Sequence, residues 1–548
     1  MNNCIIGDYN RASTEAARLQ LDTLIKDLPI TLRSGAGDVE LTGLTDDSRA
    51  VGSNNLFIAR PGADGDPMRF VASAVEAGAT ALLLPDGVEC DAPEHVAVLQ
   101  AKPGTFVDQR LAGQLAERFY AHPSKKLKLI GVTGTNGKTT TVTITKHLLE
   151  SAGHKCGLIG TVELDTGSAA GPTPATLTTP GAIQLTQLLT EMVANGCTHC
   201  VMEVSSHALH QGRADHVRFA AAAFTNLTQD HLDYHGNMQA YADAKAILFE
   251  SLDKDAVAVL NGDDPWSARM ARGCCSNIAF SAVLKPDGEL PPDQIGKRRC
   301  CVRPIELTAA ASKAEFHGRL DSFTALLPMP GPHNLSNALQ ATALALVAGG
   351  LSAEQLKQGI ETCKPVPGRL EPVGPDWPQT QGASSKSPDP LPTVLVDYAH
   401  TPDALENVGK ALRDLTKGRL ITVFGCGGDR DRAKRPLMSK AAQQYADVVV
   451  LTSDNPRTED PQQILDDAAK GFAPHADAER REASGTEQHT IADRAEAIRF
   501  AINVADANDT VLIAGKGHED YQILGTTKHH FDDREQAAAA LREKTADV

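Results

Sequence analysis

A glycine-rich segment at residues 131–140, Gly-Val-Thr-Gly-Thr-Asn-Gly-Lys-Thr-Thr, has the residue types that bind a polyphosphate. Glycines let the backbone approach phosphate oxygens closely, so that several N–H groups can point at them. Lys138 offers a cation for the β- and γ-phosphates, and the Thr139 hydroxyl can ligate Mg²⁺. An apolar, strand-like segment precedes the loop, and a helical pattern from Thr139 to about Ala152 would turn its positive end toward the anion. We therefore predict an ATP site formed by Gly134, Thr135, Asn136, Gly137, Lys138, Thr139 and Thr140, although Val132 stands where the usual P-loop pattern has glycine.

Two polar segments downstream contain candidate ligands for magnesium. Glu203 ends an apolar, strand-like run, and His231 lies in Thr-Gln-Asp-His-Leu-Asp-Tyr-His at residues 228–235. A carboxylate, an imidazole and the Thr139 hydroxyl beside a triphosphate can together hold Mg²⁺, whose shell is completed by phosphate and water. His231 and His235 are four residues apart, which zinc sites also use, but the glutamate of H-E-x-x-H is absent. We favour magnesium, and interpret His235 as a surface or capping residue.

Several other polar residues allow two interpretations. Lys245 lies in the helical stretch 241–249 among mostly apolar neighbours, where a lysine is normally a surface residue with its stem packed on the protein. Asn334 and Asn337 stand at a predicted helix start, where they can cap the helix or contact the nucleotide. Arg369 and Asp397 lie in loops at a predicted domain boundary, so a hinge could carry them onto the nucleotide.

The chain divides by pattern into three segments, which predicts an α/β protein of three domains. Residues 1–124 combine short strand-like runs with a helix-to-strand stretch from Phe70 to Leu84, and predict a small α/β domain. Residues 125–365 alternate helical stretches with apolar runs at 200–204, 220–225 and 256–260, as in a P-loop-type ATPase domain with a parallel sheet. Residues 366–548 predict a Rossmann-like doubly wound sheet, with strands at 393–397, 420–424, 448–451 and 511–514 and helices at 402–416, 433–445, 461–471, 490–505 and 534–544. A proline-rich tract, 372–392, reads as a surface loop or linker extension.

Three polar loops follow three of the predicted strands in the last segment. They are Gly-Cys-Gly-Gly-Asp-Arg-Asp at 425–431, Ser-Asp-Asn-Pro-Arg at 453–457, and Gly-Lys-Gly-His-Glu at 515–519. Ligands of doubly wound sheets bind off the carboxyl ends of the strands, so these loops should converge on one edge. Their convergence predicts a binding site there.

Composition narrows the class of protein. The chain has 548 residues and a net charge of −16, which argues against a nucleic-acid or anionic-membrane partner. There is no apolar stretch of the length that spans a membrane and no signal-peptide pattern at the start, so we expect a cytoplasmic protein. The 11 cysteines fit a reducing compartment, and the pair Cys197 and Cys200 reads as buried packing, not as a metal or redox site.

Taken in order along the chain, these motifs resemble the Mur ligase family of peptidoglycan synthesis. The resemblance rests on seven segments: Asp47-Ser-Arg49, the Gly-Thr-Asn-Gly-Lys-Thr-Thr loop, Thr178-Thr-Pro180, Glu203 to Leu209, His333 to Asn337, Gly368 to Glu371, and Asp397 to Pro402. It implies an ATP-dependent ligase that joins an amino acid to a UDP-linked muramoyl peptide, with ATP as substrate and Mg²⁺ as cofactor. A monomer is expected, with only small-molecule partners.

The resemblance also implies roles for individual residues. Lys245 matches a carbamylated lysine that binds a second Mg²⁺, which would give the metal ligands Thr139, Glu203, His231 and the Lys245 carbamate. His400 matches a position near the substrate glutamate, so the implied catalytic residues are Lys138, Lys245, His231 and His400. Asn337, Arg369 and Asp397 join the ATP site. The implied contacts to the UDP-muramoyl substrate are Ser48, Thr178, Thr179, Ser205, Gln211 and Arg213.

Within the family, the sequence Asp-Asn-Pro-Arg at 454–457 resembles that of members selecting meso-diaminopimelate. This amino acid carries both a carboxylate and an ammonium on its distal carbon, a zwitterionic head that lysine lacks because it has no distal carboxylate. Arg430 and Arg457 offer planar forks for the carboxylate, and Glu519 offers a partner for the ammonium. The implied diaminopimelate-binding residues are Arg430, Asp454, Asn455, Pro456, Arg457, Gly515 and Glu519.

The resemblance implies that the D-glutamyl carboxylate of UDP-N-acetylmuramoyl-L-Ala-D-Glu is phosphorylated by ATP and then attacked by the amine of meso-diaminopimelate. Positioning and charge stabilisation would supply most of the rate. Three alternatives stay open. The first is the same ligase adding L-lysine, and the second is a folylpolyglutamate-synthase-like ligase. The third is a P-loop ATPase with an amino-acid-sensing domain.

Overall fold

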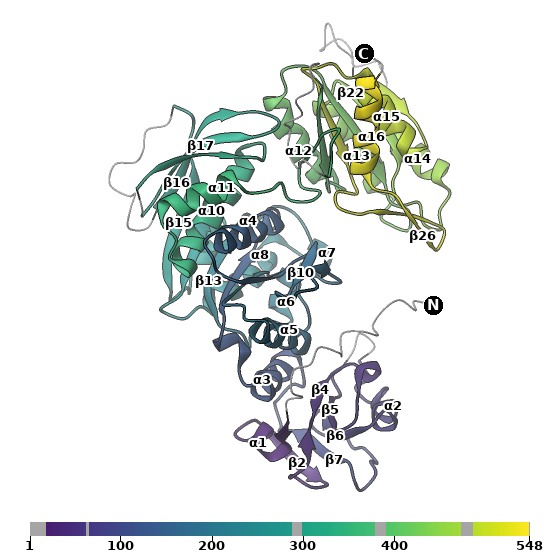
Figure 1. The fold of residues 1–548 in the computed structure, drawn as a ribbon. Helices are drawn as coiled ribbons and strands as arrows, with labels where there is room; N and C mark the ends of the chain where they lie inside the picture. Colours follow the sequence, from purple (N-terminus) through teal and green to yellow (C-terminus); the bar gives the residue numbers. More distant parts are fainter. Residues whose placement is uncertain are drawn as a thin grey trace. The chain divides into compact units, whose positions relative to one another are not determined.

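The computed structural model describes residues 18–61, 65–287, 299–319, 321–378, 391–472 and 486–546. The chain forms two compact units, which are treated separately below: residues 1–280 with 340–351, and residues 281–339 with 352–548. Among the described residues, no helix is both long and apolar enough to cross a membrane. The fold is mixed α/β, as the sequence predicts (Figure 1).

The first unit begins with a five-stranded sheet of order β2-β7-β6-β5-β4, parallel except for β2. Alternate residues of its strands face opposite sides: Leu56 and Ile58 pack with helices α1 and α3, whereas Phe57 packs with α2. Its elements are β1 (Leu19–Gln20), α1 (Leu21–Ile25), β2 (Ile30–Ser34), β3 (Glu40–Leu41), β4 (Gly43–Thr45), the 3₁₀ helix η1 (Ser48–Ala50), β5 (Asn55–Ile58), α2 (Val71–Glu76), β6 (Ala79–Leu84), β7 (Ala97–Ala101), α3 (Gln109–Phe119) and η2 (Pro123–Lys125).

The same unit then forms a second sheet, whose central strands β9-β12-β8-β13-β14 are all parallel. Strands β10 and β11 extend it antiparallel at one edge. Its elements are β8 (Lys128–Thr133), α4 (Lys138–Ser151), β9 (Cys156–Ile159), β10 (Glu163–Asp165), β11 (Thr173–Pro174), α5 (Ala182–Ala194), β12 (His199–Glu203), α6 (Ser206–His210), β13 (Phe219–Phe224), α7 (Leu232–His235), α8 (Met238–Glu250), β14 (Val257–Asn261), α9 (Ser267–Ala271) and the start of β15 (Asn277–Val283). The three runs predicted as strands at 200–204, 220–225 and 256–260 are confirmed.

The second unit begins with the end of β15 and continues with the antiparallel strands β16 (Arg299–Leu307), β17 (Ser312–His317) and β18 (Phe323–Leu327). Helix α10 (Pro332–Gly349) follows, of which residues 340–349 belong to the first unit, and then α11 (Ala353–Glu361). Its larger sheet has the order β19-β20-β24-β21-β22-β23, parallel except for β19. The remaining elements are β19 (Glu371–Val373), β20 (Thr393–Asp397), α12 (Pro402–Leu415), β21 (Leu420–Cys426), α13 (Lys434–Tyr445), β22 (Val448–Ser453), α14 (Pro461–Ala469), β23 (Glu487–Thr490), α15 (Arg494–Val504), β24 (Thr510–Ala514), β25 (Tyr521–Leu524), β26 (Thr527–His530) and α16 (Asp533–Ala546).

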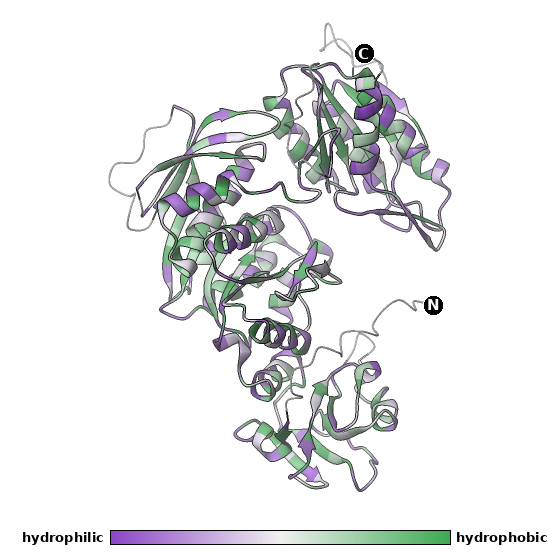
Figure 2. Ribbon diagram, viewed as in Figure 1, coloured by the Kyte–Doolittle hydropathy of each residue, from purple (hydrophilic) through white to green (hydrophobic). Residues whose placement is uncertain are grey.

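Helices cover both faces of this larger sheet, as a doubly wound fold requires. Leu395, Phe424 and Leu451 pack against helices α12, α13 and α14, and the alternate residues Val396 and Val450 pack against α15 and α16. The hydrophobic colour of the strands and the mixed colour of the helices follow this arrangement (Figure 2). The predicted Rossmann-like sheet is therefore confirmed.

Two predicted boundaries differ from the structure. The helix expected at 490–505 begins only at Arg494, because Asp493 caps it through a hydrogen bond from the Glu496 amide and residues 487–490 form β23. The tract expected to be a surface loop starts within a buried strand, since Pro372 and Val373 pair with β20. Residues 379–390 of that tract lie outside the described residues.

Candidate functional site

The predicted phosphate loop joins the end of β8 to the start of α4. Gly134 has a φ of +151°, and a Cβ at this position would lie 1.8 Å from Thr225 Oγ1. Gly137 is left-handed, with a φ of +83°, at the residue before the helix. Both positions therefore require glycine, one for close approach and the other for its backbone conformation. Helix α4 ends at Ser151, close to the predicted end.

Residues after β13 hold this loop in place. The Thr135 amide donates to the Asn226 carbonyl at 2.8 Å, and the Asn136 amide donates to Asn226 Oδ1 at 2.9 Å. Thr225 Oγ1 donates to the Asn136 carbonyl at 2.6 Å. The loop conformation is thus fixed by the residues after β13 as well as by its own glycines. Thr139 and Thr140 are buried in the first turn of α4.

Lys245 is buried, with 1% of its surface exposed, so the expectation of a surface lysine is wrong. The pattern of helix α8 suggested exposure, but the side chain turns inward, where Nζ donates to the Gly134 carbonyl at 2.8 Å. Nζ also lies 4.5 Å from the centre of the Tyr241 ring. Burial, with a smaller contribution from the Lys138 ammonium, lowers the pKa of Lys245 well below its ordinary value.

Glu203 connects the phosphate loop to the neighbouring strand end. Its Oε1 accepts hydrogen bonds from Thr139 Oγ1 at 3.0 Å and from the Thr161 amide at 2.8 Å. Its Oε2 accepts from Thr161 Oγ1 at 3.1 Å. The carboxylate is fully buried yet hydrogen-bonded on both oxygens, as a buried charge must be. Sequence reasoning missed Thr161, whose only signal is a small polar residue just after an apolar strand.

His231 lies at the start of the short helix α7 in a left-handed conformation, with a φ of +53°. Burial lowers the pKa of its imidazole, against the opposing effect of the Asp230 carboxylate. The centre of the His231 ring lies 6.1 Å from that of Tyr241, and Lys245 Nζ lies over the same Tyr241 ring, so His231 and Lys245 share one region.

His231 belongs to a cluster of four histidines and two tyrosines: His207, His210, His231, His235, Tyr234 and Tyr241. The His207 ring lies 4.8 Å from that of His231 and 5.5 Å from that of His235, and His235 Nε2 is 3.0 Å from Ser206 Oγ. His235 is thus a packed residue whose pKa burial lowers to about 4, not a simple surface histidine. The described residues contain no cluster of three or more His, Cys, Asp or Glu side chains arranged to hold a metal.

The residues expected to contact the UDP-linked substrate form a hydrogen-bonded group next to Glu203. Thr178 Oγ1 is 3.0 Å from Thr161 Oγ1, and Thr179 Oγ1 donates to the Glu203 carbonyl at 2.9 Å. The Ser205 amide donates to Thr179 Oγ1, and Ser205 caps helix α6 through the Ala208 amide. Arg213 Nη1 donates to the Thr179 carbonyl at 3.0 Å, and its other nitrogens donate to Gln211 Oε1.

Ser48 lies in the small N-terminal sheet domain, at the first residue of η1. The turn is fixed by Asp47, which accepts from the Arg49 backbone and side chain. Gln109 links this region to the group above, because its Nε2 donates to Asp46 Oδ2 at 3.2 Å and its Oε1 accepts from the Ala182 amide at 2.6 Å. The structure thus connects the segment around Asp47 to the segment after Thr179, a link that the sequence did not reveal.

In the second unit, Asp397 is a buried carboxylate that organises the backbone at the end of β20. Its oxygens accept from the amides of Leu370 and Ala399, each at 2.8 Å. Burial raises the pKa of Asp397 despite the nearby Arg369. The guanidinium of Arg369 lies over the Tyr398 ring at 4.8 Å, and His400 Nδ1 is 2.8 Å from the Tyr398 carbonyl with the imidazole exposed.

Asn334 and Asn337 are buried in the first turns of α10. Asn334 Nδ2 donates to the Pro330 carbonyl at 2.9 Å, and Asn337 Nδ2 donates to Asn334 Oδ1 at 3.3 Å. An N-cap residue stands immediately before the first helical residue, whereas α10 already begins at Pro332. Neither asparagine is therefore at the N-cap position of this helix.

The three polar loops after β21, β22 and β24 converge at the carboxyl edge of the larger sheet. The Gly428 amide donates to the Asn455 carbonyl at 2.9 Å, and Arg457 Nη1 donates to the Gly428 carbonyl at 2.7 Å. A Cβ on Gly428 would lie 1.8 Å from the Pro456 carbonyl oxygen, so glycine is required for the two loops to approach. Arg430 is exposed on this edge, where its guanidinium is open to a ligand in solution.

The third loop brings a carboxylate to the second. Asn455 Nδ2 donates to Glu519 Oε2 at 3.2 Å, and Asn455 Oδ1 accepts from Lys516 Nζ at 3.1 Å and from the Ile523 amide at 3.0 Å. The Asn455 amide is therefore used within the protein. Burial raises the pKa of Glu519, and the neighbouring Asp454 carboxylate raises it further. Gly515, with a φ of +121°, lies beside this group.

Comparison with known proteins shows which proteins this chain is similar to. Two family models match, the Mur ligase middle domain at residues 132–345 and the Mur ligase, glutamate ligase domain at residues 384–517. The UDP-N-acetylmuramoyl-L-alanyl-D-glutamate–2,6-diaminopimelate ligase of Parasynechococcus marenigrum (strain WH8102) is 44% identical over 531 residues, which are 96% of this chain and 99% of the relative. The ligase of the same name from Geobacillus thermodenitrificans (strain NG80-2) is 41% identical over 96% of this chain and 100% of its own length.

A solved structure of an enzyme with that name is 31% identical, with a TM-score of 0.66 over 96% of this chain and 99% of the other. That agreement, together with the two matched domains, is consistent with the predicted three-domain architecture. Since the similarity extends over nearly the whole chain, the protein belongs to the Mur ligase family of ATP-dependent, amide-bond-forming ligases.

Proposed function

We propose that this protein joins meso-diaminopimelate to UDP-N-acetylmuramoyl-L-Ala-D-Glu at the expense of ATP, giving the UDP-linked tripeptide of peptidoglycan synthesis. The observation that carries this proposal is the Glu203 network, in which one buried carboxylate joins Thr139 of the phosphate loop to Thr161 and, through it, Thr178. A ligase that phosphorylates a carboxylate must hold the ATP γ-phosphate and that carboxylate side by side. The names of the related ligases support the choice of substrates.

The residues around Thr139 fit magnesium. Its preferred ligands are oxygens, and it is usually bound through one or two carboxylates together with substrate phosphates and water. Thr139 and Glu203 offer a hydroxyl and a carboxylate, 3.0 Å apart, at the start of α4. When bound there, Mg²⁺ would neutralise charge on the phosphates. Thr161 orients the carboxylate through two hydrogen bonds, and this fixes the direction of its remaining lone pairs.

We also propose that Lys245 is carbamylated and, with His231, holds a second magnesium ion. Carbamylation requires a neutral amine, which attacks CO₂ to form an N–C bond while its proton passes to solvent. The lowered pKa of Lys245 supports this chemistry, because it increases the neutral fraction of the amine. The carbamate would be an anion in place of a buried amine, beside the imidazole of His231.

The chain's own groups then account for the first step. The D-glutamyl carboxylate attacks the γ-phosphorus of ATP, which gives an acyl phosphate and ADP. Lys138 Nζ lies within 2.9 Å of the loop carbonyls of Gly134 and Thr135. From there its positive charge can stabilise the negative charge on the transferring phosphoryl group. Backbone amides of the loop residues Gly134 to Thr140 and the amino end of α4 support the remaining phosphates.

The second step requires the amine to approach the acyl phosphate. The amine of meso-diaminopimelate that is not on the distal carbon attacks the acyl carbonyl. The tetrahedral adduct then collapses, and inorganic phosphate leaves. We propose that Arg430 and Arg457 bind the distal carboxylate, while Glu519 and Asp454 bind the distal ammonium, with Pro456 and Gly515 shaping the loops. His400 contacts the substrate glutamate, and Asn337, Arg369 and Asp397 belong to the nucleotide site.

The proposal includes the organisation of the chain. We propose an N-terminal UDP-substrate domain at 1–124, a central ATP domain at 125–365 and a C-terminal amino-acid domain at 366–548. The family matches at 132–345 and 384–517 fall inside the last two ranges. Ser48, Thr178, Thr179, Ser205, Gln211 and Arg213 would bind the UDP-linked substrate. A cytoplasmic monomer without macromolecular partners completes the proposal.

The test is phosphate release with ATP, Mg²⁺ and UDP-N-acetylmuramoyl-L-Ala-D-Glu, with the product mass checked. Parallel reactions receive meso-diaminopimelate, L-lysine or no amine, and Lys138→Ala serves as the inactive control. Phosphate release and a tripeptide product only with meso-diaminopimelate are expected. Equal turnover with L-lysine would contradict the amine assignment. Release that is indifferent to the UDP-linked substrate would indicate a plain ATPase.

A further inference from the structure

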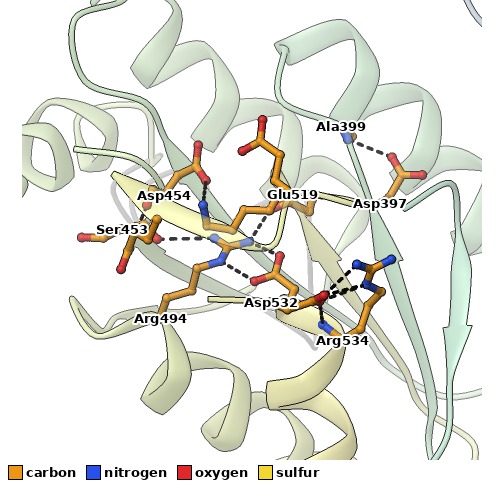
Figure 3. Close-up of polar contacts among 12 residues, drawn as sticks. Asp397, Ala399, Ser453, Asp454, Arg494, Glu519, Asp532 and Arg534 are labelled. Carbon is orange, nitrogen blue, oxygen red and sulfur yellow. Dashed lines mark hydrogen bonds and ion pairs between the residues drawn. The ribbon is translucent and has the colours of Figure 1, made fainter. Parts of the chain in front are cut away.

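Two buried cations that no step above uses lie beneath the loops proposed to bind the amine. Arg494 is the first residue of α15 and Lys516 follows Gly515, and their exposed fractions are 2% and 0%. A buried cation is costly unless it is paired and hydrogen-bonded, so its partners indicate what it holds in place. Figure 3 shows this region, with Ser453, Asp454, Glu519 and Asp532 labelled around Arg494.

Arg494 braces the ends of two strands. Its Nη1 donates to the Ser453 carbonyl at 3.4 Å, and its Nη2 donates to the Ala514 carbonyl at 3.0 Å. Ser453 is the last residue of β22 and Ala514 the last residue of β24. The residues immediately after them are Asp454 and Gly515, with which both proposed amine-binding loops begin. Arg494 therefore fixes the backbone at the points where both loops leave the sheet.

Asp533 fixes the guanidinium in this position. Its two oxygens accept from Arg494 Nε and Nη2, each at 2.7 Å, and both side chains are fully buried. This bidentate pair holds the plane of the guanidinium, since the two parallel hydrogen bonds leave it no rotation. The remaining N–H groups of Arg494 are thereby directed at the two strand ends.

Lys516 joins the side chains of the same two loops. Its Nζ donates to Asn455 Oδ1 at 3.1 Å and to the Tyr521 carbonyl at 2.8 Å, and lies 3.3 Å from Asp454 Oδ1. Asn455 in turn donates to Glu519. Burial raises the pKa of Glu519, and repulsion from the Asp454 carboxylate raises it further. A cation between their loops offsets that repulsion and keeps both carboxylates near the same ligand group.

We propose that Arg494 and Lys516 are positioning residues for amine binding: they hold Asp454, Asn455 and Glu519 in the geometry that receives the distal ammonium of diaminopimelate. This inference rests on the proposed function. Neither residue needs to touch the substrate. Arg494 acts on the backbone at the loop origins, and Lys516 acts on the loop side chains.

The test compares Arg494→Lys and Lys516→Met with a matched control, Arg419→Lys. Arg419 also braces this sheet, through Asp509 and the Val504 carbonyl, but it does so where β21 begins, at the edge remote from the loops. For each variant, steady-state kinetics give separate KM values for meso-diaminopimelate, ATP and the UDP-linked dipeptide, and thermal unfolding shows whether the variant is folded.

For both site variants, we expect KM for meso-diaminopimelate to rise roughly tenfold or more, because small displacements of binding groups weaken a multipoint site strongly. KM for ATP and for the dipeptide should stay at the wild-type values. Arg419→Lys should lower thermal stability and leave all three KM values unchanged. If Arg494→Lys does not fold, Lys516→Met still decides the question.

A folded site variant with a wild-type KM for the amine would overturn the inference, as would an equal rise in all three KM values. Failure of the wild-type protein to use meso-diaminopimelate at all would instead overturn the proposed function, so the two failures are distinguishable.

Discussion

Lys138 and Lys245 donate hydrogen bonds to the same oxygen, the carbonyl of Gly134, at 2.9 and 2.8 Å. Two amine side chains on one acceptor repel each other unless one of them is neutral. Lys245 is the buried member of the pair, and burial together with Lys138 lowers its pKa well below the ordinary value. The Gly134 carbonyl is therefore shared by the proposed phosphate cation and by an amine that favours its neutral form.

Lys245→Met is expected to change how stability depends on pH. Between the lowered pKa of Lys245 in the folded protein and its ordinary value of 10.5, the unfolded chain binds a proton that the folded chain does not. Stability of the wild type therefore falls as pH decreases through this window, by about 1.4 kcal/mol per pH unit for one proton. The methionine variant lacks that loss, so its stability relative to wild type should rise as pH is lowered from 10 toward 7 in CO₂-free buffer.

Urea unfolding of the two proteins at several pH values measures this difference. The control is Lys146→Met: burial alone would lower the pKa of Lys146, but its ion pairs with Asp165 and Glu150 raise it. The ion pairs of Lys146 stabilise the folded protein below the ordinary pKa of lysine, and this stabilisation is lost only above that pKa. The stability of Lys146→Met relative to wild type should therefore not rise as pH falls from 10 to 7. A flat difference for Lys245→Met would contradict the neutral buried amine and weaken the case for carbamylation.

Gly134→Ala should abolish tight ATP binding. The new Cβ would lie 1.8 Å from Thr225 Oγ1, which holds the Asn136 carbonyl, and the φ of +151° disfavours any side chain. We expect the ATP dissociation constant, measured by calorimetry, to rise at least about tenfold because the loop amides move. The control Gly153→Ala, at a φ of +91° with no heavy atom within 4 Å, should cost about 1 kcal/mol of stability and leave ATP binding intact. Wild-type affinity in Gly134→Ala would remove the loop from the ATP site.

Thr161→Val should weaken the response to magnesium. The substitution keeps the backbone hydrogen bond to Glu203 Oε1 but removes the hydroxyl donor to Oε2 and the contact with Thr178. Groups that orient a metal ligand commonly affect affinity, so the Mg²⁺ concentration for half-maximal turnover should rise roughly tenfold. Thr161→Ser retains the hydroxyl and should restore the wild-type value. If the valine variant titrates with Mg²⁺ like wild type, Glu203 is not a ligand that Thr161 orients.

The parts of this fold that local pattern determines could be predicted from sequence. Strands β20, β21, β22 and β24 were predicted because runs of buried branched residues between helical patterns specify a doubly wound sheet. The phosphate loop was predicted for the same reason, since glycine, lysine and threonine in that order meet a local requirement.

Other features depend on partners distant in sequence. The inward direction of Lys245 is set by the Gly134 carbonyl, 111 residues away, and the helical pattern of α8 carries no sign of it. Thr161 acquires its role only because β9 lies next to β12 and so brings it to Glu203. Arg494 looked like an ordinary residue of a helical pattern, and its contacts arise where β22, β24 and α16 meet.

Arg457→Lys should reduce selection of diaminopimelate over lysine. Arg457 has a left-handed backbone, and its Nη1 donates to the Gly428 carbonyl, which leaves the rest of the planar fork for a carboxylate. A lysine side chain at position 457 keeps the positive charge but cannot donate two parallel hydrogen bonds to a carboxylate. KM for meso-diaminopimelate should therefore rise by roughly tenfold. Turnover of the substrate L-lysine, which has no distal carboxylate, should stay unchanged. Competition assays with both amines measure the ratio directly. Arg432→Ala is the matched control, because Arg432 is exposed and pairs with Glu459. A ratio unchanged in Arg457→Lys, or lowered equally in Arg432→Ala, would assign the distal carboxylate to another residue of the edge.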